Sequence, residues 1–259
     1  MSKVPLSVVI LTKNEEKNIL ECIVSVKGWA DEIIVVDDFS TDRTIEIAEK
    51  LTDKVFVKKM EIEGTHRNWA YAQVRNSWVL SLDSDERMTE ELKQEISSAL
   101  RQESEFVAYT IPRRNYIGDY WVKSGGWYPS PQLKLFKKDK FKFEEVEVHP
   151  RAFLDGSCGH LKGDIIHYSY KSYEDFLNKL NKQTTLEAQK WVRTGRKMSM
   201  GRAFWRAIDR FFRRFIGRKG WRDGFTGFMI AFFDTVYQVM SYAKFRQMIL
   251  EKKTNEEQK

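Results

Sequence analysis

The sequence predicts an α/β protein with a doubly wound, mostly parallel sheet, followed by a helical segment at the C-terminal end. Apolar runs alternate with helical patterns over the first hundred residues, at spacings typical of βαβ units. Several of these runs end in acidic or polar residues, which favours a ligand-binding edge of the sheet. The last quarter of the chain differs, because it alternates arginine with aromatic residues.

The first hundred residues contain four candidate strands, each followed by a helical pattern. Residues 6–11 form a continuous apolar run of the kind that is buried in a parallel sheet. Strands are expected at residues 6–11, 32–36, 54–57 and 78–82. Helices are expected at residues 16–26, 43–51, 65–75 and 89–100.

The regular alternation ends after residue 108. Further strands are expected at residues 109–112, 133–136, 141–148 and 151–154, and a helix at residues 173–192. Between the first two of these strands lies a segment rich in aromatic residues and glycine, residues 115–131. Its rings are interpreted either as a surface that stacks on a sugar or as a packed aromatic lid.

Charge and cysteine content narrow the class of protein. Residues 1–195 carry a net charge of −2, whereas residues 196–259 carry 15 Lys and Arg against 6 Asp and Glu, or +9. A nucleic-acid enzyme would carry basic charge around its catalytic cleft, so nucleic acid is not an expected partner. Cys22 and Cys158 suggest no disulfide framework, and no signal peptide precedes the first strand, so a cytoplasmic protein is expected.

Asp83-Ser84-Asp85 is the most informative motif of the chain. It follows the apolar run 78–82, so both carboxylates are expected at the carboxyl edge of the sheet, where α/β proteins bind ligands. Carboxylates this close repel each other unless a cation lies between them, and Mg²⁺ or Mn²⁺ commonly joins them to phosphate oxygens. The motif therefore favours a divalent-metal site for a phosphorylated substrate. The alternative is a solvated turn in which Asp85 and Glu86 cap the following helix.

Residues 196–250 combine a cationic and an aromatic helical face. The arginines are Arg202, Arg206, Arg210, Arg213, Arg214 and Arg218, and they alternate with large apolar residues such as Phe204, Trp205, Phe211 and Phe212. Amphipathic helices of this composition lie at the surface of anionic membranes. Polar residues within 225–243 argue against a helix that spans the membrane. The alternative is a helical hairpin packed on the rest of the protein, with its arginines solvated.

Three sites at expected strand ends follow one another in the sequence: Thr12-Lys13-Asn14-Glu15, Asp37-Asp38-Phe39-Ser40 and Asp83-Ser84-Asp85-Glu86. This series resembles the inverting family 2 glycosyltransferases with a GT-A fold. Residues 30–37 are similar to the second-strand pattern of the lipopolysaccharide-core β-1,4-glucosyltransferase subfamily. The resemblance continues through Gly126-Trp127-Tyr128-Pro129 and Val148-His149 into the C-terminal helices.

The resemblance implies a role for residues of each motif. Thr12 and Glu15 would line the nucleotide pocket, and Asp38 would accept a hydrogen bond from the base of the nucleotide. Asp83 would orient the ribose and the diphosphate, and Asp85 would ligate a divalent cation, Mg²⁺ or Mn²⁺.

Two further residues have two interpretations each. By the resemblance, His167 would face the metal or the diphosphate; the alternative is a buried histidine at a strand end. Arg67 would steady a phosphate of the nucleotide, and the alternative is a solvated surface charge.

The catalytic base is where the sequence departs from the family pattern. The relatives carry an acidic residue after the Val-His pair, at the position of the base, whereas this chain carries Pro150, which accepts no proton. Alternation along the expected strand 141–148 puts Glu145, Glu147 and His149 on one face. Glu147 and Glu145 are the candidates for the base, and the alternative is that this cluster is an exposed strand face.

The resemblance also implies an organisation and a set of partners. Residues 1–195 would form the GT-A domain, with a nucleotide-binding half at 1–100 and an acceptor-side half at 101–195. Residues 196–259 would form a basic amphipathic region that binds the anionic inner face of the bacterial cytoplasmic membrane. The donor would be a nucleoside diphosphate sugar, foremost a UDP-sugar. The acceptor would be a glycolipid or polysaccharide of lipopolysaccharide-core, O-antigen or capsule type.

Two other functions remain open from the sequence. A sugar-phosphate nucleotidyltransferase also joins an α/β sheet to metal-bound phosphates, but Thr12-Lys13-Asn14-Glu15 lacks the glycines that such an enzyme carries after its first strand. A non-catalytic protein that binds a membrane surface or nucleic acid would use the basic C-terminal region. That function would leave the three acidic strand-end sites without a role.

Overall fold

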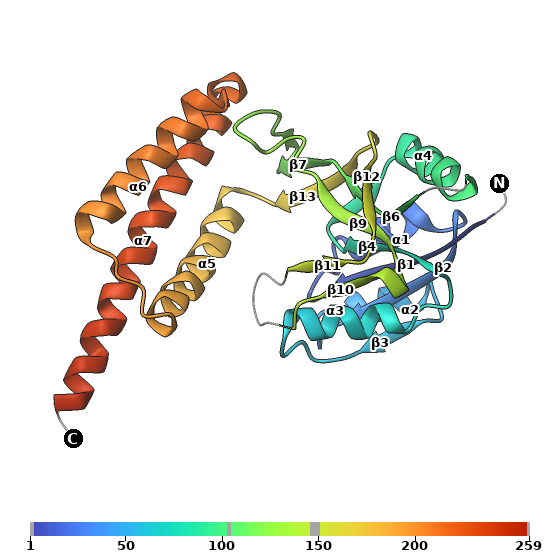
Figure 1. Cartoon of the computed structure of the whole chain (residues 1–259), viewed down its shortest axis with the longest axis horizontal. Coiled ribbons are helices and arrows are strands. Elements are labelled where there is room, and N and C mark those ends of the chain that lie inside the picture. Colours follow the sequence, from blue (N-terminus) through green and yellow to red (C-terminus); the bar gives the residue numbers. More distant parts are fainter. Residues whose placement is uncertain (1–2, 103–104, 146–150, 258–259) are drawn as a thin grey trace. The chain divides into compact units, whose positions relative to one another are not determined.

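The computed structural model describes residues 3–102, 105–145 and 151–257, and the described chain divides into two compact units (Figure 1). One unit, here called the sheet unit, holds the residues up to Arg114 together with Ser130–His167. The other, the helical unit, holds Asn115–Pro129 and the residues from Tyr168 onward.

A seven-stranded, mostly parallel sheet forms the centre of the sheet unit (Figure 1). Its strand order is β12-β6-β9-β4-β1-β2-β3, and among these described strands β9 alone runs antiparallel to its neighbours. The strands are β1 (Val4–Thr12), β2 (Ala30–Asp37), β3 (Val55–Val57), β4 (Trp78–Asp83), β6 (Phe106–Ile111), β9 (Gln132–Lys137) and β12 (Ser157–His160). The parallel set β3-β2-β1-β4 confirms the four strands predicted in the first hundred residues.

Helices cover both faces of this sheet, as the prediction of a doubly wound fold requires. Successive side chains of a strand point to opposite faces. Val8 and Ile10 of β1 belong to a buried cluster with residues of three helices, whereas Val9 belongs to a second cluster with a fourth helix. The first three helices are α1 (Ile19–Val26), α2 (Thr44–Glu49) and α4 (Glu90–Arg101), and the fourth is α3 (Glu63–Ala72).

Two further antiparallel pairings of short strands lie in the sheet unit. The strand β5 (Glu86–Met88) pairs with β13 (Ile165–Tyr170), so that Glu86 lies opposite His167. The strand β10 (Phe141–Phe143) follows the short 3₁₀ helix η1 (Lys138–Lys140) and pairs with β11 (Ala152–Leu154).

Two predictions change at these short strands. The expected strand 141–148 ends at Phe143, and Glu147 and His149 lie outside the described residues. The alternative interpretation, in which Asp85 and Glu86 cap the next helix, is wrong, because β5 intervenes. Thr89 caps α4 instead, and its Oγ1 accepts a hydrogen bond from the N–H of Leu92 at 3.3 Å.

Three long helices make up most of the helical unit (Figure 1). They are α5 (Tyr173–Arg193), α6 (Met200–Phe212) and α7 (Gly224–Glu257); a π-helical turn η2 (Arg213–Gly217) and a 3₁₀ turn η3 (Gly220–Asp223) join α6 to α7. The helix α7 packs against both α5 and α6. The boundary predicted at residue 195 therefore falls between helices that belong to one compact unit. In the part of the chain that the structure describes, no helix combines the length and the apolar character needed to cross a membrane.

The aromatic segment is fastened to η3 by one buried carboxylate, an arrangement called the Asp223 clamp below. Asp223 accepts hydrogen bonds from the hydroxyl of Tyr120 at 3.1 Å and from the backbone N–H groups of Lys123 at 3.1 Å and Ser124 at 2.7 Å. The segment also contains the end of β7 (Arg113–Ile117) and the whole of β8 (Tyr120–Trp121). Asp223 therefore holds residues 120–124 of the aromatic segment against η3.

Candidate functional site

The carboxyl ends of β1, β2 and β4 are neighbours in the sheet. Thr12 at the end of β1 is paired with Asp37 at the end of β2, and Leu11 is paired with Asp83 at the end of β4. The N–H of Asp38 donates to the carbonyl oxygen of Thr12 at 2.9 Å. The three strand-end motifs therefore lie at one edge of the sheet, the edge where α/β proteins bind ligands.

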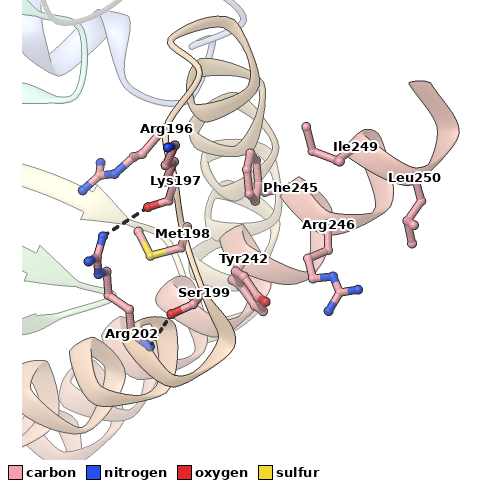
Figure 2. A pocket seen from close by; sticks show the side chains of 10 residues that line it. All are labelled: Arg196, Lys197, Met198, Ser199, Arg202, Tyr242, Phe245, Arg246, Ile249 and Leu250. Carbon is pink, nitrogen blue, oxygen red and sulfur yellow. Dashed lines mark hydrogen bonds between the residues drawn. The ribbon is translucent and has the colours of Figure 1, made fainter. Parts of the chain in front are cut away.

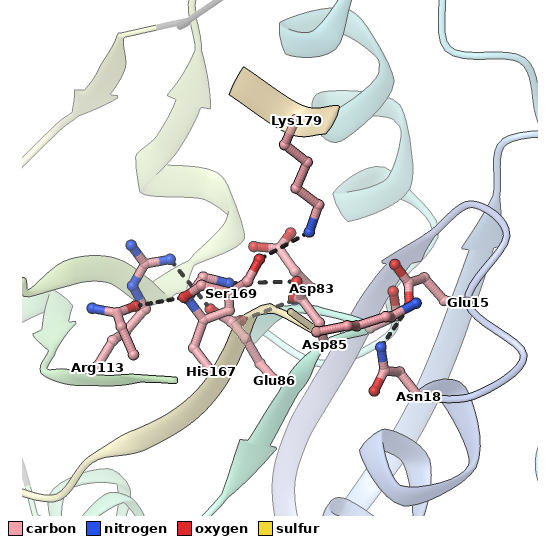
Figure 3. A network of polar contacts seen from close by, with 12 residues as sticks. Glu15, Asn18, Asp83, Asp85, Glu86, Arg113, His167, Ser169 and Lys179 are labelled. Atoms are coloured by element: carbon pink, nitrogen blue, oxygen red, sulfur yellow. Dashed lines mark hydrogen bonds and ion pairs between the residues drawn. The ribbon is translucent and has the colours of Figure 1, made fainter. Parts of the chain in front are cut away.

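The loop after β1 is tied to the loop after β2 by hydrogen bonds. Asn14 has a left-handed backbone with φ +54°, and its N–H donates to Ser40 Oγ at 2.7 Å. The N–H of Glu15 donates to Thr44 Oγ1 at 2.8 Å, and its carboxylate accepts a hydrogen bond from Asn18 at 2.6 Å (Figure 3). The two loops consequently form one connected rim, to which Glu15 contributes a half-buried carboxylate.

Asp38 and Thr12 are buried polar residues at this rim. Asp38 accepts hydrogen bonds from Lys13 Nζ at 2.6 Å and from the N–H of Met60 at 2.8 Å. Burial would raise the pKa of Asp38, but these two hydrogen bonds hold it below its ordinary value. The hydroxyl of Thr12 is buried and has no hydrogen-bond partner among the described residues. An ionised acceptor and an unpaired hydroxyl suit a ligand that donates hydrogen bonds.

Asp83 is held between two cations. Its carboxylate lies 2.8 Å from Lys134 Nζ and 3.5 Å from Arg67 Nη2. Burial would raise the pKa of Asp83, but the charges of Lys134 and Arg67 hold it well below its ordinary value. The same attraction raises the pKa of Arg67 against the effect of its burial. Arg67 is therefore part of an ion network with Asp83 and is not a solvated surface charge.

Lys134 was not predicted as a site residue. It is a buried lysine in β9, between Leu133 and Leu135, and its ammonium also lies 2.7 Å from the carboxylate of Glu86, which is fully buried. The second oxygen of Glu86 lies 3.6 Å from Arg113 Nη1 (Figure 3). The signal in the sequence was a lysine within the short apolar stretch 133–136, because a buried lysine requires an anionic partner.

Asp85 and His167 are brought together although 82 positions separate them in the chain. The pairing of β5 with β13 places His167 Nε2 3.5 Å from one carboxylate oxygen of Asp85 (Figure 3). The other oxygen, Oδ1, is buried and has no hydrogen-bond partner among the described residues. A buried carboxylate oxygen without a partner is costly, and a bound cation would satisfy it.

The donor set at Asp85 and His167 fits a metal that keeps ligands from outside the protein. No group of three or more His, Cys, Asp or Glu side chains within the described ranges is arranged to hold an ion. Mg²⁺ commonly binds through one or two carboxylates and completes its shell with water and substrate phosphates, and imidazole is also a ligand for transition metals. A carboxylate and an imidazole are therefore enough protein ligands for a cation that a diphosphate also coordinates.

Comparison with protein families matches residues 7–160 to the family model described as Glycosyl transferase family 2. This match covers more than half of the chain. The chain belongs to glycosyl transferase family 2. It is accordingly a transferase that acts on glycosyl groups, and the sequence-level resemblance to this family is confirmed.

Relatives of the same family cover nearly the whole chain. An uncharacterized glycosyltransferase of Rickettsia typhi is 33% identical in an alignment of 258 positions that covers 95% of this chain and 88% of the relative. The lipopolysaccharide core biosynthesis glycosyltransferase LpsC of Rhizobium meliloti is 27% identical, over 95% of this chain and 93% of the relative. Among solved structures, the mannosyltransferase PcManGT of Pyrobaculum calidifontis in complex with GDP-Man and Mn²⁺ matches with a TM-score of 0.54 and 11% identity, over 95% of this chain and 88% of that one. This likeness confirms the GT-A type of fold.

Of the two candidates for the catalytic base of this family 2 glycosyltransferase, the structure describes Glu145. Glu145 is exposed and lies 3.0 Å from Lys142 Nζ, which lowers the pKa of its carboxyl group. Glu147 lies outside the described residues. The backbone just before Glu145 packs tightly on α3, where a Cβ atom on Gly64 would lie 1.8 Å from the carbonyl oxygen of Glu144.

Phe39 is a second residue at the rim that was not predicted. It follows Asp38, its side chain is 58% exposed, and its backbone is left-handed with φ +54°. A bulky residue is uncommon in this conformation, which glycine adopts readily. The available signal in the sequence was an aromatic residue directly after the acidic pair Asp37-Asp38.

Proposed function

We propose that this family 2 glycosyltransferase transfers a sugar, with inversion, from a nucleoside diphosphate sugar to a hydroxyl group of a cell-envelope glycan. The observation that carries the proposal is the convergence of Asp38, Asp83 and Asp85 at one sheet edge, with His167 beside Asp85. The ionised Asp38 would accept the ring N–H of the base, which suits the uracil of a UDP-sugar. Asp83, which Lys134 and Arg67 hold in place, would orient the ribose and the diphosphate.

Asp85 and His167 would hold a divalent cation, Mg²⁺ or Mn²⁺. When bound, the cation would neutralise negative charge on the departing nucleoside diphosphate. The buried Oδ1 of Asp85 supports this assignment, because it has no hydrogen-bond partner among the described residues and a bound cation would supply one.

Inversion requires in-line attack by an acceptor hydroxyl on the anomeric carbon. A bond forms between that oxygen and the carbon as the bond to the diphosphate oxygen breaks on the opposite face. The hydroxyl proton passes to a carboxylate, for which Glu147 and Glu145 are the candidates. Lys142 lowers the pKa of Glu145, which makes this carboxylate a weaker base.

The relative LpsC, whose name assigns it to lipopolysaccharide core biosynthesis, supports the proposed acceptor class. Its similarity over nearly the full length of both chains supports a glycolipid or polysaccharide acceptor of the same kind for this protein.

The helical unit would bind the anionic inner face of the cytoplasmic membrane. Large apolar side chains are exposed along α6, η3 and α7, including Trp205 at 70% and Phe225 at 69%. Ring contacts link the helices, since Phe211 lies 5.9 Å from Phe228 between ring centroids. Exposed apolar surface beside many arginines supports contact with a lipid interface.

The decisive experiment screens nucleoside diphosphate sugars for release of the diphosphate in the presence of Mn²⁺, with wild type and Asp85→Ala. We expect release from one class of donor and a loss of roughly a hundredfold or more in Asp85→Ala, in line with removal of one electrostatic transition-state contact. Mn²⁺ binding in the presence of UDP, followed by electron paramagnetic resonance, should weaken in the same variant. The matched control is Asp155→Ala, an exposed carboxylate paired with Lys140. Equal activity of Asp85→Ala and wild type would refute the metal assignment.

A further inference from the structure

A groove in the helical unit combines an apolar floor with a cationic rim (Figure 2). It lies between the segment that joins α5 to α6, the start of α6 and the C-terminal half of α7. Its volume is about 600 Å³, within the range of sites that bind small molecules. None of the residues that line it belongs to the strand-end site described above.

The floor of the groove is apolar. It consists of Met198 from the joining segment together with Tyr242, Phe245, Ile249 and Leu250 from α7. Phe245 is buried against Trp191, with ring centroids 5.8 Å apart, so this part of the floor is a fixed surface. Leu250 is 54% exposed, so an apolar group that covered it would lower the free energy of the complex.

Four cations line the same groove: Arg196, Lys197, Arg202 and Arg246. No carboxylate lines it, and none of the four forms an ion pair with any acidic residue in the described parts of the chain. Like charges gathered around one cavity repel each other, and a bound anion would remove that repulsion.

Two of these cations are already positioned by other contacts. The guanidinium of Arg196 lies 5.2 Å from the centroid of the Trp191 ring, and Arg202 Nη1 donates to the carbonyl oxygen of Lys197 at 3.2 Å (Figure 2). Ser199 caps α6, a helix of 13 residues whose N-terminal end carries positive partial charge. Burial and the guanidinium of Arg196 both lower the pKa of the nearby Arg206, as expected in a region of positive potential.

We infer that this groove binds one molecule of an anionic phospholipid, with the phosphate at the cationic rim and an acyl chain along the apolar floor. Guanidinium groups and a helix N-terminus are the donors that bind phosphate groups in proteins. A free phosphate would leave the apolar floor uncovered, and a neutral chain would leave the four cations uncompensated. The inference rests on the proposed membrane contact, because the membrane is the source of the lipid. It adds a specific site for one lipid molecule to the adsorption of exposed rings. It does not involve the transferase reaction.

The test titrates the full chain with monomeric dihexanoyl phosphatidylglycerol and measures binding by isothermal titration calorimetry. We expect one saturable site, and binding that is weaker by about tenfold or more for inorganic phosphate and for dihexanoyl phosphatidylcholine. Arg202→Gln with Arg246→Gln should weaken binding by about tenfold or more, because each removes a charge-assisted contact. Leu250→Gln alone should weaken binding of the lipid but leave binding of inorganic phosphate unchanged.

The matched control removes two exposed arginines of the same unit outside the groove, Arg213→Gln with Arg222→Gln. It should bind the lipid as wild type does. Three results would each overturn the inference. They are an equal loss of lipid affinity in the control pair, phosphate binding as tight as lipid binding, and no saturable binding of lipid to wild type. Hydrolysis of the sugar nucleotide should be the same in wild type and in Arg202→Gln with Arg246→Gln, so failure of the lipid site is distinguishable from failure of the proposed transferase activity.

Discussion

At the scale of single residues, the positive charge of Lys134 balances two carboxylates, Asp83 and Glu86, at the carboxyl edge of the sheet. Its ammonium faces Asp83 and Glu86 at 2.8 and 2.7 Å. The low pKa of Asp83 and the raised pKa of Lys134 both arise from this attraction, which outweighs the burial of the two groups. Without the cation, two neighbouring carboxylates would repel each other in a poorly solvated place.

We predict that Lys134→Met lowers the free energy of unfolding by about 3 kcal/mol near neutral pH, because it leaves buried carboxylates unpaired. A carboxyl group whose pKa is lowered by folding stabilises the protein above its ordinary pKa of about 4 and loses that effect as the pH falls. The deficit of the variant should therefore be greatest near neutral pH and should shrink as the pH falls through about 4. Urea denaturation at a series of pH values measures it.

The control for this prediction is Lys140→Met, which removes an exposed lysine paired with Asp155. It should change stability little at any pH, because exposed ion pairs contribute little. A deficit of Lys134→Met that is independent of pH would assign the effect to packing and contradict the electrostatic explanation.

Asp38 gives a second prediction at this scale. Replacing its carboxylate by an amide, in Asp38→Asn, should raise the KM for the donor by about tenfold or more, since a hydrogen bond to a charged group is worth roughly 1.5–3 kcal/mol. The kcat should change less, because the base of the nucleotide is remote from the reacting carbon. Steady-state release of the nucleoside diphosphate separates the two constants. A fall in kcat with an unchanged KM would place Asp38 near the reacting atoms instead.

At the scale of elements, α3 contacts the residues after β10, next to the candidate base Glu145. Gly64 permits this contact, since a Cβ there would lie 1.8 Å from the carbonyl oxygen of Glu144. Gly201, near the start of α6, has no neighbour within 4 Å of its Cβ position. The two helical glycines therefore differ in the space around them.

We predict opposite effects for the same substitution at these two positions. Gly64→Ala should destabilise the protein by about 1–3 kcal/mol through overpacking against backbone. Gly201→Ala should stabilise it by up to about 1 kcal/mol, because alanine favours the helix. Thermal unfolding followed by circular dichroism compares the two variants. Activity should fall in Gly64→Ala and stay unchanged in Gly201→Ala. A more stable Gly64→Ala protein would contradict the prediction, because it would mean that α3 shifts to accommodate the methyl group without loss of stability.

Local pattern was enough to predict the central strands but not the short strand β5. The strands β1, β2 and β4 are long apolar runs buried on both faces, and the strand-end positions of Thr12, Asp38 and Asp83 followed from them. The strand β5 contains the charged residues Glu86 and Arg87, a pattern typical of a turn. Glu86 is buried there because Lys134 and Arg113 compensate its charge. Such partners are distant in sequence, so they leave no periodic signal.

At the scale of the whole molecule, exposed apolar rings are concentrated in the helical unit, along α6, η3 and α7. We predict that Trp205→Ser with Phe225→Ser weakens sedimentation with phosphatidylglycerol liposomes by about tenfold or more, since each ring would lose its burial in the lipid interface. The control pair is Leu177→Ser with Leu186→Ser, which removes exposed apolar side chains from α5. Equal losses in both pairs would contradict a membrane-binding face on α6 and α7.

The Asp223 clamp has a consequence for the order in which the protein matures during synthesis. Asp223 lies 99 to 103 positions after the residues that it holds. A ribosome adds about 5–20 residues per second, so roughly 5–20 s pass between the emergence of the aromatic segment and the arrival of its anchor. The edge formed by β1, β2 and β4 is complete long before then. A nascent chain therefore assembles its proposed nucleotide site early and acquires the finished aromatic segment only when nearly all of the protein has been made.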